Sequence, residues 1–461
     1  MIRTFALLFL LLLAVAFPCQ GEVSRPATPT VPAPPKGFER RVVDEPVFKG
    51  RVYILEGGKE HAESVVLVHG LGDLASGTWA NLLPILVERY HVIAFDLPGF
   101  GNSEKKNALY SPENYAAFLR WVVDRYVEGP FHLVGHSLGG SIALHFAGTR
   151  PGNLRKLILA DVAGLLHKAV ITNHFLQPDL QSRWPGAPAQ PLETVGDLIG
   201  ATVLGLEGLP LDPDVLLENK ALRGSALGGD PTRIAALALV QSNFSSILPR
   251  VEAPTLLLWG AEDQVTPLRI GRLLEGTLKN ARLVRIPRAG HVPMLEQATR
   301  FNREVIAFLA APPPPPAPPL SATGGRNAVF QNQTGLVLEG SYQSLKLSNC
   351  RNARLTRVTA ESVEIVGSTV SLQQCVIKGK KTGLRVQDST ITATALTVEA
   401  DLAMEVSRST LDLAGARLKG RQAAVRCADQ STILFSVSQS ESPIARVYLH
   451  GMWLVTPQNP L

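Results

Sequence analysis

The chain has 461 residues, of which 45% are hydrophobic and 18% charged, so it is long enough for more than one core and too apolar to be disordered. Its formal net charge of +6 is not gathered into a lysine and arginine block, which argues against a nucleic-acid-binding protein. None of its 4 cysteines forms a CxxC pair, and neither a metal site nor a cofactor is predicted.

The first segment is typical of an export signal. Arg3 precedes an apolar run from Phe5 to Phe17, so residues 1–21 are expected to be a signal peptide. The run is short for a membrane span, and we expect an exported protein, periplasmic or extracellular, with no span. Cys19 resembles a lipoprotein acylation site only loosely, because Pro18 stands where a small residue is expected, and a lipid anchor there stays an alternative.

Two proline-rich stretches divide the rest of the chain. Residues 22–41 and 311–325 are predicted linkers, which leaves a first domain over 42–310 and a second over 326–461. In the first domain, short apolar strands alternate with helix-like stretches, which predicts an α/β fold with a mostly parallel sheet buried on both faces. The predicted strands are VVLVHG (65–70), HVIAFD (91–96), FHLVGH (131–136), KLILAD (156–161), TLLLWG (255–260) and RLVRIP (282–287).

The third of these strands leads into a GxSxG motif, Gly135-His136-Ser137-Leu138-Gly139, and a helix-like stretch follows. A tight strand-to-helix turn strains the backbone of its apex residue and requires small neighbours. The turn presents the hydroxyl of Ser137 at a helix N-terminus, where developing negative charge is favoured. The motif therefore indicates a nucleophilic serine.

A serine hydroxyl needs a base that is itself oriented by an acid. His291 follows the last predicted strand and is the candidate base. Asp263, at the carboxyl end of strand 255–260, is the favoured acid. Glu262 and Asp161 stay open as alternatives, since the acid can also follow an earlier strand.

The order of nucleophile, acid and histidine resembles that of the α/β-hydrolase family over residues 42–310. The resemblance implies that Ser137 attacks a carbonyl carbon, that His291 transfers the proton, and that Asp263 orients the imidazole. A serine in this position disfavours the epoxide hydrolases and dehalogenases of the fold, which use an aspartate. Ester, thioester, amide and carbon–carbon cleavage next to a carbonyl remain compatible.

The same resemblance assigns roles around the serine. His69-Gly70-Leu71-Gly72 looks like the family's oxyanion loop, so the backbone amides of Leu71 and Leu138 are expected to form the oxyanion hole. Asp96 is interpreted as a structural turn residue and Trp79 as packing near the loop. Residues of about 162–250 are expected to form a helical cap whose apolar content favours an acyl or aromatic group over a sugar.

The second domain has a different pattern. A Ser-Thr-X triplet followed by alternating residues begins at Ser368, Ser389, Ser409 and Ser431. A repeat of about 20 residues built from short strands predicts a solenoid, and it resembles a right-handed parallel β-helix of the pectate-lyase-like kind. The acidic residues do not gather at one repeat position, so no lyase activity is predicted.

Outward-facing residues of the repeats alternate in charge. They are Lys346, Glu364, Arg385, Glu405 and Arg426. Stacked about 4.8 Å apart they would place opposite charges side by side and specify the register. The same alignment places Cys427 and Cys375 inward, which favours small core residues over a disulfide, whereas Cys350 falls near a turn without an evident partner.

Two functions follow from these features. The first is an exported serine hydrolase that cleaves a carboxylic ester, or a related acyl bond, through an acyl-enzyme. Its partners would be a small-molecule acyl substrate and, through the basic β-domain, an anionic cell-surface polymer, unless that domain serves only as a spacer. The alternative is a catalytically idle hydrolase fold that binds a cell-surface polymer through the β-helix.

Overall fold

The computed structural model describes residues 33–72, 74–175, 212–312 and 325–458. The expected signal peptide, Cys19, most of both linkers and residues 176–211 of the expected cap lie outside the described residues. Within the described ranges, no helix has the length and apolar character needed to cross a membrane.

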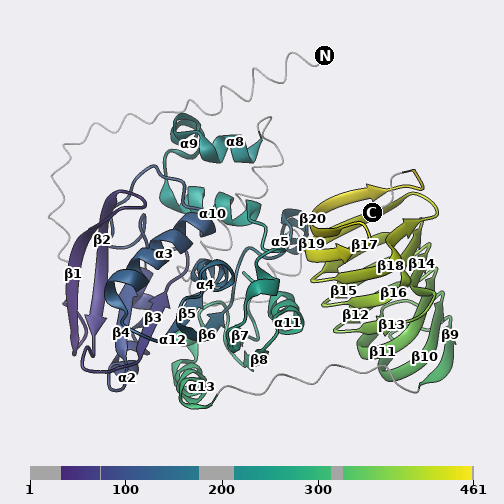
Figure 1. Ribbon diagram of the computed structural model, residues 1–461, viewed down its shortest axis with the longest axis horizontal. Helices are drawn as coiled ribbons and strands as arrows, with labels where there is room; N and C mark the ends of the chain where they lie inside the picture. Colours follow the sequence, from purple (N-terminus) through teal and green to yellow (C-terminus); the bar gives the residue numbers. More distant parts are fainter. Residues whose placement is uncertain (1–32, 73, 176–211, 313–324, 459–461) are drawn as a thin grey trace, which may run out of the picture. The chain divides into compact units, whose positions relative to one another are not determined.

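The first domain is built on an eight-stranded sheet in the order β1-β2-β4-β3-β5-β6-β7-β8 (Figure 1). From β4 to β8 neighbouring strands are parallel, and β1 and β2 pair antiparallel at the edge. The strands are β1 (Phe38–Glu45), β2 (Gly50–Gly57), β3 (Ser64–Val68), β4 (His91–Phe95), β5 (Phe131–His136), β6 (Leu154–Ala160), β7 (Thr255–Gly260) and β8 (Ala281–Ile286). This confirms the predicted mostly parallel sheet.

Strand β1 begins at Phe38, inside the stretch that the sequence assigns to a linker. Residues 39–42 are exposed and the first three of them are charged, and β1 is an edge strand that pairs only with β2. Charged side chains on an edge strand prevent pairing with other molecules, and they also hide the strand from a search for apolar runs.

Both faces of the sheet are buried, and neighbouring residues of a strand enter different cores. Val66 and Val68 of β3 belong to one core, and Val65 and Leu67 belong to the other. The first core is covered by α3 (Pro112–Tyr126), α4 (Leu138–Thr149), α10 (Pro231–Gln241) and α11 (Leu268–Thr277). The second is covered by η1 (Ala75–Trp79), α2 (Leu83–Leu86), α12 (Pro293–Glu296) and α13 (Ala298–Ala310).

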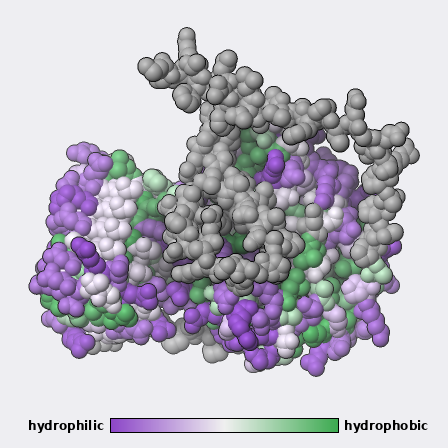
Figure 2. All heavy atoms as spheres, turned by 180° about the vertical axis from the view of Figure 1, so that it is seen from behind, coloured by the Kyte–Doolittle hydropathy of each residue, from purple (hydrophilic) through white to green (hydrophobic). Residues whose placement is uncertain are grey.

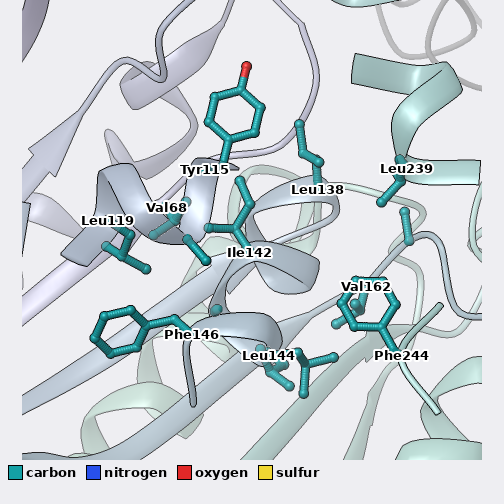
Figure 3. Packing of buried hydrophobic residues seen from close by; sticks show 14 of the residues in the cluster. Val68, Tyr115, Leu119, Leu138, Ile142, Leu144, Phe146, Val162, Leu239 and Phe244 are labelled. Atoms are coloured by element: carbon teal, nitrogen blue, oxygen red, sulfur yellow. The ribbon is translucent and has the colours of Figure 1, made fainter. Parts of the chain in front are cut away.

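Helix α4 is held firmly in the first core. Figure 3 shows Leu138 and Ile142 of this helix packed among Val68, Tyr115 and Leu119. The segment expected to form the cap contains α5 (Lys168–Phe175), α8 (Pro213–Glu218), α9 (Lys220–Leu227), α10 and η2 (Leu248–Arg250) among its described residues. On the face shown in Figure 2, hydrophilic residues cover much of the described surface, and hydrophobic ones lie between them.

The C-terminal domain is all β, and its strands are parallel except for the last. The strands are β9 (Arg326–Gln331), β10 (Val337–Ser348), β11 (Ala353–Val366), β12 (Thr369–Gln373), β13 (Val376–Lys378), β14 (Thr382–Gln387), β15 (Thr390–Thr394), β16 (Thr397–Ser407), β17 (Thr410–Ala414), β18 (Arg417–Cys427), β19 (Ser431–Glu441) and β20 (Arg446–Val455). Their pairings close into a ring, β11-β12-β15-β17-β19-β18-β16-β13-β11, so by connectivity this is a parallel β-barrel. The expected parallel all-β domain is confirmed.

The predicted charge register is also confirmed. Lys346 lies opposite Glu364, and the pairings continue through Arg385, Glu405 and Arg426. The Lys346 ammonium is 3.0 Å from Glu364, and the Arg385 guanidinium is 2.8 Å from Glu405. Such exposed pairs contribute only a few tenths of a kcal/mol each, so they specify register more than stability.

The serines of the triplets form a buried stack. Ser368 accepts a hydrogen bond from the backbone N–H of Cys350, and Ser389, Ser409 and Ser431 each accept one from the preceding serine of the stack. Ser389 Oγ also donates to the carbonyl of Gln387 in its own repeat, at 2.6 Å. The serine of each triplet therefore lies at a turn between strands and provides hydrogen-bond partners for buried backbone groups.

The three described cysteines, Cys350, Cys375 and Cys427, are free and buried. Cys427 lies opposite Val406 in register, and Cys375 is 1% exposed. The predicted inward positions of these two residues are confirmed, and Cys350 is equally enclosed.

The stack gives a stability prediction. Ser389→Ala leaves the N–H of Ser368 buried without its acceptor and should lower the free energy of unfolding of the β-domain by about 1–3 kcal/mol. Thr390→Ala is the matched control, because Thr390 is exposed, and it should change little. Chemical denaturation of both variants checks this. Equal effects would contradict the role of the stack.

Candidate active site

Ser137 occupies the turn between β5 and α4 with φ 52° and ψ −117°, and it is 1% exposed. Small neighbours are required there, as the sequence predicts. A Cβ added at Gly135 would lie 2.4 Å from the carbonyl oxygen of Gly139, and one at Gly139 would lie 2.2 Å from that of Val68. The backbone around Ser137 can therefore close only with glycine at both positions.

The structure brings Ser137, His291 and Asp263 together. His291 Nε2 is 3.0 Å from Ser137 Oγ, and His291 Nδ1 is 2.9 Å from Asp263 Oδ2. With Nδ1–H donating to the carboxylate, Nε2 is left free to accept the serine proton. All three residues are buried, so little water competes for these contacts.

Asp263 is held by donors from its own loop. Its Oδ1 accepts from the backbone N–H groups of Val265 and Thr266, at 2.8 and 3.0 Å, and the Thr266 hydroxyl donates to Oδ2. Burial alone would raise the pKa of Asp263, but the charge and hydrogen bond of His291 and the Thr266 donors lower it below its usual value. Asp263 is thus kept ionised.

The two alternative acids are placed differently. Glu262 is exposed, whereas Asp161 is fully buried and its Oδ1 accepts the N–H of Gly260 at 2.9 Å. Neither has a hydrogen bond to His291 among the described residues, so the geometry favours Asp263.

His136 has a role that the sequence did not suggest. Its Nε2 is 2.7 Å from the carbonyl oxygen of His291 and donates to it, so it fixes the backbone of the base. Burial lowers the pKa of His136 to about 3, so the ring is neutral.

Thr266, which supports the acid, was also missed. Its position three residues after Asp263, typical of a local side-chain turn, was the available signal.

The loop after β3 contacts the serine. A Cβ at Gly70 would lie 2.9 Å from Ser137 Cβ, so the segment that continues into Leu71 passes directly beside the nucleophile. Leu138 begins α4 next to Ser137. The structure therefore places both expected oxyanion residues in segments that adjoin Ser137.

Asp96 has the structural role expected of it, whereas for Trp79 only its burial is shown. Asp96 accepts from the backbone N–H groups of Ser76 and Asn102, at 2.9 and 2.8 Å, and ties the loops after β3 and β4 together. Trp79 is fully buried in the second core.

A small apolar cavity of about 20 Å³ adjoins the site. Its wall includes Ala163, whose N–H lies 3.4 Å from the carbonyl oxygen of Ser137, and Thr266. The other lining residues are Gly164, Ile171, Leu239, Val240, Val265, Pro267 and Ile270.

Comparison with known proteins agrees with the fold of the first domain. A family model described as "alpha/beta hydrolase fold" matches residues 63–298. The chain belongs to this α/β-hydrolase family.

Individual relatives cover the same part of the chain. It is 30% identical to a 2-hydroxy-6-oxononadienedioate/2-hydroxy-6-oxononatrienedioate hydrolase of Cupriavidus pinatubonensis over 54% of this chain and 87% of the relative. It is 32% identical to a pimeloyl-[acyl-carrier protein] methyl ester esterase of Chromobacterium violaceum over 53% and 93%. A solved structure of a lipase-like protein from Acinetobacter baumannii is 28% identical, with a TM-score of 0.44 over 59% of this chain and 91% of that one.

The buried His136 predicts a pH dependence of stability. The unfolded chain binds a proton at this histidine below pH about 6.5, whereas the folded chain does so only near pH 3, so stability is lost as the pH falls between these values. His136 contributes at most about 1.4 kcal/mol per pH unit to this loss.

Replacing this histidine should flatten the dependence. His136→Gln keeps a donor for the carbonyl of His291 but cannot titrate, so its loss of stability from pH 7 to pH 5 should be smaller than that of the wild type. Denaturant titrations at both pH values measure the difference. An identical loss in the two proteins would show that His136 titrates normally when folded.

Proposed function

We propose that the protein is an exported serine hydrolase that cleaves a carboxylic ester through an acyl-enzyme on Ser137. The observation that carries this proposal is the hydrogen-bonded series Ser137, His291 and Asp263 at a strained glycine-flanked turn. An idle fold kept only for binding would not need this arrangement, which weighs against the alternative of a pure binding protein.

The geometry suits the following reaction. Ser137 Oγ attacks the ester carbonyl as His291 Nε2 takes its proton, and the N–H groups of Leu71 and Leu138 stabilise the oxyanion. The imidazolium, stabilised by Asp263, then gives the proton to the departing alcohol. Water activated by His291 attacks the acyl-enzyme and releases the acid.

The relatives, and not the cavity, indicate the bond, because none of Ser137, Asp263 and His291 lines that cavity. The methyl ester esterase among the relatives supports an ester as the bond. Carbon–carbon cleavage next to a carbonyl is the second candidate, because the substrate named for another relative is an oxo-acid.

For the C-terminal domain we propose a right-handed parallel β-helix that acts as a spacer. Each strand pairs in register with one about 20 residues further on, and parallel connections are nearly always right-handed. Many of its basic residues are paired with acidic ones, which weakens the case for an anionic polymer as partner. These basic residues are Lys346, Arg357, Lys378, Arg385, Arg408, Lys419, Arg421 and Arg446.

We also propose export to the periplasm or outside the cell. The support is the arginine, apolar run and polar continuation at the N-terminus. The described cysteines are free, so the proposed location rests on the leader and not on disulfides.

The serine is tested directly. The wild type should react with a fluorophosphonate probe and hydrolyse short p-nitrophenyl esters, and Ser137→Ala should lose labelling and lower kcat by on the order of 10⁴-fold or more. Ser141→Ala, on the next turn of α4, is the control and should still be labelled. An unlabelled wild type with a normal melting curve would rule out the proposed function.

Polymer binding separates the two roles of the β-domain. The full-length protein should pass through immobilised polygalacturonate at about 0.15 M ionic strength, because many basic residues of the β-domain are already paired. A variant with Glu364→Gln, Asp401→Asn and Glu405→Gln removes the acidic partners of Lys346, Arg421 and Arg385 and should be retained. Salt-sensitive retention of the wild type would favour the polymer-binding role over the spacer.

A further inference from the structure

His69 begins the loop that passes beside the nucleophile, and the reaction above does not use its side chain. It follows β3 directly and is fully buried. Its ring meets that of Phe100 edge-on, with the ring centroids 6.0 Å apart. Both ring nitrogens have backbone partners: the N–H of Leu97 is 2.8 Å from Nε2, and the carbonyl oxygen of Gly70 is 2.6 Å from Nδ1. The ring therefore joins the loop after β3 to the loop after β4.

These two contacts define where the ring carries its proton. A backbone N–H can only donate, so Nε2, which faces the N–H of Leu97, is the nitrogen without a proton. The neutral ring then carries its proton on Nδ1, which donates to the carbonyl of Gly70. A charged ring would turn the N–H of Nε2 toward the N–H of Leu97. Burial lowers the pKa of His69, in agreement with a neutral ring.

The carbonyl that His69 holds shares a peptide unit with the N–H of Leu71, one of the two expected oxyanion donors. This peptide bond is trans, and in a trans peptide the C=O and N–H bonds point in opposite directions. Fixing the carbonyl of Gly70 therefore also fixes the direction of the Leu71 N–H. The unit lies at the nucleophile, since a Cβ added at Gly70 would be 2.9 Å from Ser137 Cβ.

We propose that His69 is a positioning residue whose Nδ1–H holds the carbonyl of Gly70 and thereby aims the N–H of Leu71 at the oxyanion. The catalytic consequence rests on the proposed function, in which negative charge develops on the ester oxygen. A donor that is already oriented needs no rearrangement when that charge forms, which is why preorganised donors are effective. Without the Nδ1–H bond the Gly70–Leu71 peptide is free to rotate, and the oxyanion loses part of its stabilisation.

Two substitutions separate the contacts of the two ring nitrogens. Asparagine places its amide at the position of Nδ1, so His69→Asn keeps a donor for Gly70 but offers no acceptor to Leu97. Glutamine reaches to the position of Nε2, so His69→Gln keeps an acceptor for Leu97 but loses the donor at Nδ1. Each variant is therefore the matched control for the other.

The experiment measures kcat and KM on a short p-nitrophenyl ester, the rate of fluorophosphonate labelling, and the midpoint of chemical denaturation. His69→Gln should lower kcat by roughly 10- to 100-fold with little change in KM, because the affected donor acts in the transition state. Labelling should slow in parallel. His69→Asn should keep kcat within about threefold of the wild type but unfold at a lower denaturant concentration, because a buried N–H loses its acceptor.

A histidine that only ties the two loops together would give the opposite order. His69→Asn would then lose at least as much kcat as His69→Gln, and that result would overturn the proposal. A kcat of His69→Gln within about threefold of the wild type would also overturn it. The acid limb of the pH–rate profile, which reports His291, should be the same in all three proteins, and a shifted limb would place the effect at the base instead.

A second measurement does not depend on turnover. Nitrogen NMR of protein with ¹⁵N-labelled histidine identifies the protonated ring nitrogen, and the signals of His69 are those that His69→Asn lacks. At neutral pH we expect a proton on Nδ1 and none on Nε2. If the wild type is inactive and unlabelled but His69 has this form, the proposed function fails and the hydrogen bond to Gly70 stands. If the ester is hydrolysed and the proton is on Nε2, only the present inference fails.

Discussion

The strained turn at Ser137 is the constraint on which the rest of the site depends. A non-glycine residue with φ 52° and ψ −117° costs of order 1–3 kcal/mol, and it persists only where the surroundings hold it. Here α4 is packed into the first core through Leu138 and Ile142, and β5 is buried on both faces (Figure 3). The same packing aims the hydroxyl at His291. Hydrophobic burial in the sheet thus supports a conformation that the local backbone alone would avoid.

Burial also determines which groups around Ser137 are charged and which are neutral. Away from water, each charge must be balanced by specific donors, and the loop after β7 supplies them to Asp263 through Val265 and Thr266. Neutral groups complete the arrangement, because the ring of His136 is held uncharged and donates to the backbone of His291. The site therefore combines one carboxylate with neutral supports, and the imidazole is left as the group that changes charge.

The sequence predicted the parts that depend on local patterns. Apolar runs located β5 and β7 with their observed bounds, and the glycine-flanked motif located Ser137. The edge strand β1 was missed because its exposed charged residues have no apolar signal. The contact of His136 with His291 joins residues more than a hundred positions apart, and no local pattern encodes it. In the β-domain the repeat predicted the register, but not the use of its serines.

Positive φ angles have different meanings in the two domains. In the hydrolase domain Ser137 is one strained residue whose side chain is aimed at a base. In the β-domain the strain recurs at equivalent corners: Asp388 and Arg408 have φ 49° and 45°, and each is followed by a serine of the stack. That serine accepts a hydrogen bond from a buried N–H of the neighbouring repeat. The stack therefore accounts for the strained corner, and no catalytic role is needed to explain it. Strain that repeats with the fold is structural, and strain at a residue whose side chain meets an oriented base indicates function.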